Sequence, residues 1–227
     1  MKPIQLAIAM AVATSAIACG ATPPADGDHA AVATAAPAVA PAHANQTEVA
    51  APKLQADLRA LWNGHVVATR NYAHAVKADG SADADRAEQD VVGNAKSISA
   101  AVASFYGAPA GDTMLTLLGG HWEGVKALTD AQRSGDSADA AQALEVLVAN
   151  AGDIAVFLGG ANPHLPADAV RALLIAHGGH HATQTQQIMA GDTAAEAQTW
   201  VAMQAHMDVI ADALAGAIAK QFPDKAN

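Results

Sequence analysis

The segment DSADA, residues 136–140, occurs in recognisable form three times in this chain. It corresponds to GSADA at residues 80–84 and to DTAAE at residues 192–196, and the copies start 56 residues apart. In each copy a Ser or Thr precedes an Ala-rich helical pattern, which predicts Ser81, Ser137 and Thr193 as helix N-caps. The spacing indicates an internal repeat, in which each copy begins the second helix of a helical hairpin.

The same spacing extends well beyond these caps. LRAL at residues 58–61 matches VRAL at residues 170–173, with the intervals unbroken by insertions. Apolar and polar positions both recur. The matching triplets are Ile98, Ile154 and Ile210; Val102, Leu158 and Leu214; His65, His121 and His177; and Asn94, Asn150 and His206.

From residue 53 onward, apolar residues recur at steps of three and four, which is typical of amphipathic helices. Apolar residues make up 52% of the chain and aromatic residues only 4%, an excess that is largely Ala, the strongest helix former. We therefore predict an all-α domain over residues 53–227. It would be an up-down bundle of six helices built from three hairpins, at residues 53–107, 108–162 and 163–223.

The start of the chain has the pattern of a bacterial lipoprotein. Lys2 precedes a short apolar stretch that ends in Ala16-Ile17-Ala18-Cys19-Gly20, which resembles a lipobox with Cys19 as the lipidated residue. We expect a signal peptide at residues 1–18, an Ala/Pro-rich flexible tether at residues 19–52, and a lipid anchor in the outer membrane. The protein would face the periplasm or the cell surface. A plain secretory signal cleaved near Ala18 is the alternative, and no later segment is expected to span a bilayer.

The charge of the chain excludes one large class of partners. The formal net charge is −10 and there is no basic run, so the surface repels phosphate groups. We expect the lipid anchor to bind a membrane and expect no nucleic-acid partner. The sequence does not identify a protein partner.

The repeated histidines fall on the apolar stripes of their helices. Residues equidistant from the turn of an antiparallel hairpin lie at the same height, so His65 is level with Asn94. By the same relation His121 is level with Asn150, and His177 is level with His206. If the hairpins close into a bundle, these six side chains form one polar layer.

Two interpretations of this layer remain open. In one, each buried His is only hydrogen-bonded to the residue across its hairpin. In the other, neutral imidazoles converge on zinc, copper, nickel or iron. Asn94 and Asn150 would then lie outside the ligand shell and accept hydrogen bonds from the ring N–H groups of the ligands. The predicted ligands are His65, His121, His177 and His206, with His180 and His181 as possible additions.

Adjacent glycines accompany these histidines in LLGGH at residues 117–121 and RALLIAHGGHHATQ at residues 171–184. Each glycine inside a helix costs about 1 kcal/mol relative to Ala. We interpret them as room for a close helix or for a ligand.

Several other chemistries lack their motifs. A ferritin-like di-iron centre needs Glu-x-x-His on inner faces, and c-type haem needs Cys-x-x-Cys-His; neither pattern occurs. No phosphate loop, dinucleotide fingerprint or nucleophile–base set is present. We therefore expect no nucleotide, disfavour haem, and favour a non-enzymatic role.

Five segments together resemble a largely uncharacterised family of secreted or lipidated helical-bundle proteins of bacteria. They are LRALWNGHVVATR (58–70), SFYGAPAGDTMLTLLGGH (104–121), NAGDIAVFLGGANP (150–163), LLIAH (173–177) and MDVIADALAGAIAKQFP (207–223). The resemblance covers nearly the whole domain and implies no activity. It places Trp62, His65, Thr69, Arg70, His121, Asn150, Asn162, Pro163 and His177 on family motif positions. The chain differs from the family at His180, His181 and His206.

The sequence thus predicts a periplasm-facing lipoprotein that binds a transition metal through a histidine layer, for metal holding, delivery or sensing. One alternative is a structural or interaction module with His–Asn core pairs and no metal. The other is a small redox or oxygen-handling metalloprotein.

Overall fold

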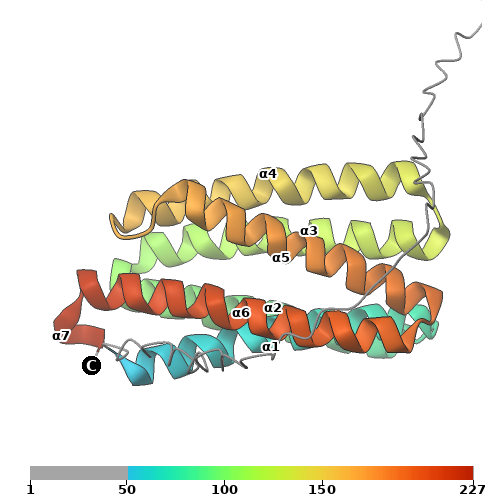
Figure 1. Cartoon of the computed structure of the whole chain (residues 1–227), viewed down its shortest axis with the longest axis horizontal. Helices are drawn as coiled ribbons and strands as arrows, with labels where there is room; N and C mark the ends of the chain where they lie inside the picture. Colours follow the sequence, from blue (N-terminus) through green and yellow to red (C-terminus); the bar gives the residue numbers. More distant parts are fainter. Residues whose placement is uncertain (1–50, 227) are drawn as a thin grey trace, which may run out of the picture. The chain divides into compact units, whose positions relative to one another are not determined.

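The computed structural model describes residues 51–226, and all regular secondary structure in that range is helical (Figure 1). This confirms the all-α prediction. The helices are α1 (Pro52–Lys77), α2 (Ser81–Tyr106), α3 (Ala108–Ser134), α4 (Ser137–Ala161), α5 (Ala167–Ala190), α6 (Thr193–Gln221) and the short α7 (Pro223–Ala226).

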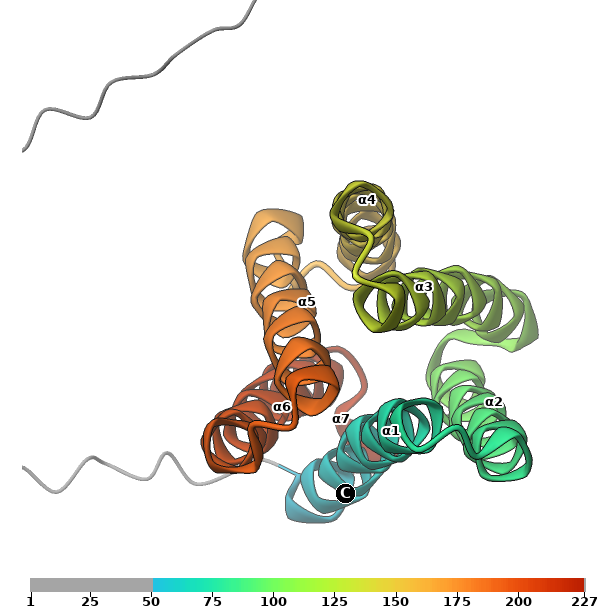
Figure 2. The ribbon, with the colours of Figure 1, turned by 90° about the vertical axis from the view of Figure 1, so that its right-hand side faces the viewer.

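The six long helices close into a ring, which Figure 2 shows end-on. Each helix packs against its neighbour in sequence, and α6 returns to pack against α1. The three first helices of the hairpins, α1, α3 and α5, also contact one another. Side chains on their inner faces are therefore brought together at the middle of the bundle.

The second helix of each hairpin begins one residue earlier than the cap prediction implied. Ser81, Ser137 and Thr193 are the first helical residues, and the N-caps are Gly80, Asp136 and Asp192. Asp136 Oδ1 accepts hydrogen bonds from the backbone N–H groups of residues 138 and 139 at 2.9 and 3.0 Å. The carboxylate accepts hydrogen bonds from the free N–H groups and interacts favourably with the positive end of the helix dipole. Asp136, and not the adjacent Ser137, is therefore the N-cap.

The two later hairpin turns share a glycine cap. Gly135 and Gly191 both have φ near +75°, the left-handed conformation that ends a helix and that other residues adopt at a cost.

The apolar core lies in two clusters. The larger one includes Leu58, Met114 and Met207 and occupies the half of the bundle away from the hairpin turns. The smaller one lies between α1, α2, α3 and α4, where Tyr72 meets the edge of Trp122 with ring centroids 4.8 Å apart.

One hydrogen bond recurs in all three hairpins. Asn94 Nδ2 donates to the Leu61 carbonyl at 2.9 Å, and Asn150 Nδ2 donates to the Leu117 carbonyl at 3.0 Å. In the third hairpin His206 Nε2 lies 2.9 Å from the Leu173 carbonyl. Each bond joins residues 33 positions apart. This common contact agrees with the proposed 56-residue repeat, which stays a prediction from sequence.

The bundle begins slightly earlier than predicted. Ala51, placed in the tether by the sequence, is 1% exposed, and Pro52 starts α1 at the helix position where a missing N–H costs nothing. The predicted signal peptide, Cys19 and the remainder of the tether lie outside the described residues.

Two helices, α4 and α6, are long and apolar enough to cross a membrane by length and mean hydropathy (1.5 and 1.2), contrary to the expectation that no later segment would qualify. In each, 39% of the apolar window is buried inside the bundle. Residues such as Leu147 in α4 and Ile210 in α6 contribute to the two core clusters, so core packing accounts for much of this hydropathy.

Candidate metal centre

Four histidine side chains meet inside the bundle. His65 comes from α1, His121 from α3, and His177 and His181 both come from α5. One ring nitrogen of each lies within 4.8 Å of one ring nitrogen of every other. The exposed fractions of the four residues are 5%, 8%, 2% and 2%, so the group is enclosed by protein.

The cluster lies near the middle of its three helices. His65 is on the buried stripe of α1 that contains Leu58 and Trp62, and His121 follows Leu118 on α3 in the same way. On α5, His177 and His181 are four residues apart, so they occupy one face on successive turns. The contact between the three helices then brings these faces together.

The rings are arranged around a common centre rather than stacked in a column. His65 has centroid distances of 5.7, 5.6 and 5.7 Å to the rings of His121, His177 and His181. The two α5 rings are closer, at 4.4 Å, and His181 Nε2 lies 3.0 Å from His177 Nε2. In a tetrahedral zinc site with bonds of about 2.0–2.1 Å, ligand nitrogens lie about 3.3 Å apart. Small side-chain movements would therefore bring these nitrogens to coordination distance.

Burial keeps all four imidazoles neutral at pH 7. Loss of solvation lowers the pKa of His65 from 6.5 to about 3, with a further decrease from His121. It lowers the pKa of His121 to about 4, although Asn150 beside that ring opposes the decrease. The pKa values of His177 and His181 fall well below 6.5 through burial first and neighbouring histidines second. A neutral imidazole offers the lone pair that a metal ion requires.

Some buried polar atoms at the cluster have no hydrogen-bond partner. They include His121 Nε2 and His177 Nδ1, and also the side-chain oxygens of Asn94 and Asn150. Leaving a buried polar atom unpaired costs about 1–3 kcal/mol, so native proteins rarely do it without a functional reason. Coordination of an ion through His121 Nε2 would satisfy one nitrogen that the protein itself leaves unpaired.

The structure brings together three of the four ligands predicted from the sequence, together with His181. His206 does not belong to the group of four: its Nε2 lies against the Leu173 carbonyl, at the position where the other hairpins have an Asn. His206 is on α6, which does not share the inner position of α1, α3 and α5. Equal height along the bundle therefore did not place it at the centre.

The sequence did contain a signal for His181, namely its four-residue spacing from His177. Its counterparts in the other hairpins are Thr69 and Val125, so the repeat alone gave no reason to prefer it. His180 points to a different neighbour, with its ring centroid 5.3 Å from that of His206.

The side-chain amides of Asn94 and Asn150 donate their hydrogen bonds to helix carbonyls rather than chiefly to the imidazoles. A Cβ at Gly64 would come within 2.9 Å of Asn94 Nδ2, and one at Gly120 within 3.4 Å of Asn150 Nδ2. These two glycines precede His65 and His121 and leave room for the amide groups. Gly119, Gly178 and Gly179 border open space instead.

A cavity of about 10 Å³ adjoins the histidines and is lined by Trp62, His65, Leu118, His121, Ala151, Ile154, Leu174 and His177. That volume holds the centre of about one water-sized sphere, far too little for haem. The remaining lining is apolar, which would exclude water from an ion bound there.

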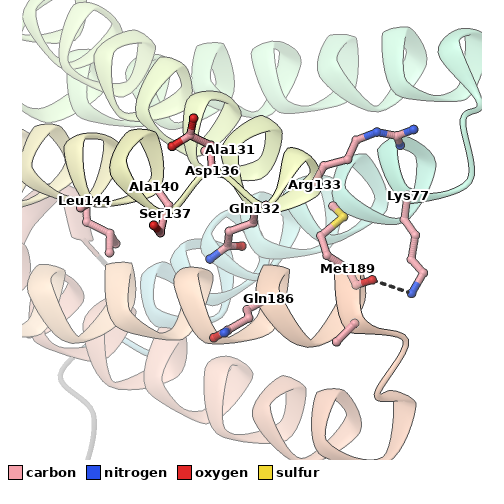
Figure 3. Close-up of a pocket in the computed structure, with 13 residues that line it drawn as sticks. Lys77, Ala131, Gln132, Arg133, Asp136, Ser137, Ala140, Leu144, Gln186 and Met189 are labelled. Atoms are coloured by element: carbon pink, nitrogen blue, oxygen red, sulfur yellow. Dashed lines mark hydrogen bonds between the residues drawn. The ribbon is translucent and has the colours of Figure 1, made fainter.

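A larger hollow lies elsewhere, near the turn between α3 and α4. Its volume is about 810 Å³, and residues from the ends of α1, α3, α4 and α5 line it, among them Gln132, Asp136 and Gln186 (Figure 3). Lys77 lies at its edge and donates a hydrogen bond to the Met189 carbonyl at 3.2 Å. None of the four clustered histidines borders this hollow.

Comparisons with protein-family models, with curated proteins and with solved structures gave no match.

Proposed function

We propose that this protein binds one transition-metal ion through His65, His121, His177 and His181 and holds it in the centre of the bundle. The observation that carries the proposal is the placement of four buried ring nitrogens, from three helices, within 4.8 Å of one another. A bundle core without a ligand role would more readily place apolar side chains there, because neutral imidazoles with unpaired nitrogens destabilise it.

The donor set favours borderline metal ions. Four neutral nitrogen ligands suit zinc, copper, nickel or iron, whereas calcium and magnesium prefer oxygen. Among the described residues, no carboxylate belongs to the group, so the ligands would not neutralise the positive charge of the bound ion.

Four protein ligands also favour holding an ion over catalysis. Structural zinc sites use four protein ligands, and catalytic sites leave one position for water or substrate. A redox or oxygen-handling role would require a fifth position or the departure of one imidazole. We therefore place holding, with delivery or sensing as its biological use, ahead of those roles.

The test is metal content and affinity of the bundle, residues 51–227, purified without a histidine tag. We expect one tightly bound ion per chain in the wild type and a large loss of affinity in His121→Leu, which replaces the ring with an apolar side chain of similar size. His164→Ala is the matched control, because His164 is exposed in the α4–α5 connection. If wild type and His121→Leu bind no metal tightly and His121→Leu is as stable as the wild type or more so, the proposal is wrong.

We also propose that the mature chain is a lipoprotein anchored through Cys19 to the outer membrane. The support is the segment Ala16-Ile17-Ala18-Cys19-Gly20 after a short apolar stretch. Incorporation of labelled palmitate in a bacterial host, absent in Cys19→Ser, would test this; equal labelling of both would refute it.

A further inference from the structure

Two half-buried histidines lie just outside the four-histidine centre. His180 on α5 and His206 on α6 have ring centroids 5.3 Å apart, which is close to the 5.6–5.9 Å that separates most rings in the centre itself. Unlike the four central residues, both are partly exposed to solvent.

The hydrogen bond of His206 leaves a metal-binding nitrogen free. A carbonyl oxygen only accepts, so His206 Nε2 must carry the proton in its contact with the Leu173 carbonyl at 2.9 Å. In the neutral ring the lone pair is then on Nδ1. A backbone carbonyl that fixes the tautomer of a histidine in this way is typical of metal ligands.

The pair adjoins the centre on both helices. His180 directly precedes His181 on α5. His206 Nε2 lies against the carbonyl of Leu173, which is one helical turn before His177. An ion at the pair would therefore be next to the two α5 ligands.

The segment of α5 beside the pair has no covering side chain. A Cβ at Gly178 or Gly179 would meet nothing within 4 Å. The residues 112 and 56 positions before Gly178, Val66 and Trp122, are 0% and 5% exposed and fill the corresponding places in the other hairpins. Gly178 lies between His177 and His181 in sequence, one turn before His181, so the gap adjoins the centre.

From these observations we propose that His180 and His206 form a second, solvent-accessible site for a transition-metal ion, through which ions reach the buried centre across the gap at Gly178. The proposal of transfer rests on the proposed function, whereas binding at the pair does not. Two imidazoles completed by water make a weak site, as a transfer step requires.

The repeat offers a matched variant for the test. His206→Asn introduces the residue that the first two hairpins have, and Asn94 and Asn150 show that Asn reaches the equivalent carbonyl. The change therefore keeps the hydrogen bond to Leu173 and removes only the imidazole. His164→Ala controls for the loss of an exposed histidine.

The first experiment measures the rate of Co²⁺ loading into the buried centre by stopped-flow absorption. We expect His206→Asn and His180→Ala to load at least tenfold more slowly than wild type and to reach the same stoichiometry. Gly178→Val, which restores the side chain of Val66, should also slow loading. Equal rates in wild type, His206→Asn and His180→Ala would overturn transfer through the pair.

The second experiment tests the pair when the centre is disabled. In His65→Leu/His121→Leu, which leaves ligands from α5 alone in the centre, Cu²⁺ should bind with an electron paramagnetic resonance signal from two nitrogens, and the further change His206→Asn should remove that signal. No such signal would overturn the second site. If instead wild type binds only one Cu²⁺, and His206→Asn abolishes it, the pair stands and the buried centre fails.

Discussion

His177 Nε2 and His181 Nε2 lie 3.0 Å apart on successive turns of α5. Without a metal ion, one nitrogen must donate a proton to the other, and both rings are then neutral. With a metal ion, both lone pairs turn to the ion at nearly the same separation. One helix thus supplies two ligands, and α1 and α3 supply one each.

Loss of the second α5 ligand should weaken the centre without abolishing it. His181→Val introduces the residue at the equivalent position of the second hairpin, Val125, so the fold should tolerate it. We expect zinc affinity to fall by at least about 100-fold. Loss of a hydrogen bond that only supports a metal ligand already lowers the affinity by about 10- to 100-fold, and loss of the ligand itself should cost more. Competition with a chelator of known affinity measures this. Unchanged affinity in His181→Val, with a loss in His206→Asn, would restore His206 as the fourth ligand.

Two glycines near the centre should respond oppositely to the same substitution. Gly64→Ala would place a Cβ 2.9 Å from Asn94 Nδ2 and displace an amide that bonds to the Leu61 carbonyl. We expect it to destabilise the fold by about 1 kcal/mol, since the cost of a lost buried hydrogen bond exceeds the gain in helix propensity.

Gly178→Ala meets open space and should instead stabilise the fold by about 1 kcal/mol. Urea unfolding of both variants in a chelator measures the difference. Equal effects would mean that the Asn94 contact contributes nothing.

The Arg70–Glu196 pair should matter far more to stability than surface ion pairs. Arg70 Nε and Nη2 donate to the two Glu196 oxygens at 2.7 and 2.8 Å, and Gln184 Nε2 donates to Oε1 at 2.8 Å. The Glu196 side chain is only 6% exposed. Glu196→Ala should cost about 3 kcal/mol because it leaves buried donors unpaired.

The exposed pair of Arg133 and Asp79 is the control for that measurement. Asp79 has a φ of +59°, which Asn tolerates well, so Asp79→Asn isolates the loss of charge. Its effect should stay below about 1 kcal/mol. Thermal unfolding of the two variants compares the pairs; similar losses would show that burial adds nothing.

The sequence predicted the helices well because apolar periodicity and turn residues are local signals. It predicted equal heights for His65, His121 and His177 because the proposed 56-residue repeat places them in one register. The identity of the fourth histidine was not predictable from height, since distance from the bundle axis depends on which helices lie inside. Contacts among α1, α3 and α5 place His181 inside and leave His206 outside. In the second and third hairpins the cap prediction failed by one residue for a local reason, because Asp136 and Asp192 compete directly with the hydroxyl that follows.

The metal-free protein should lose stability as the pH falls below 6.5. Folding lowers the pKa of His65 to about 3 and of His121 to about 4, and it lowers those of His177 and His181 as well. Between pH 6.5 and these values the unfolded chain binds more protons than the folded one. Stability is therefore full above pH 6.5 and decreases as the pH falls. Each histidine adds about 1.4 kcal/mol per pH unit to this decrease.

Titration of the carboxylates changes the folding stability only at lower pH. Glu196 and Asp212, whose pKa values are lowered chiefly by hydrogen bonds from Arg70 and Arg59, contribute stability that is lost only below their ordinary values of 4.5 and 3.8. Urea unfolding in a chelator from pH 7.5 to 5 thus isolates the histidines. His65→Leu should reduce the slope of unfolding free energy against pH by about 1.4 kcal/mol per unit. A slope near zero in the wild type would mean that the four rings become protonated without unfolding, and that water reaches the centre.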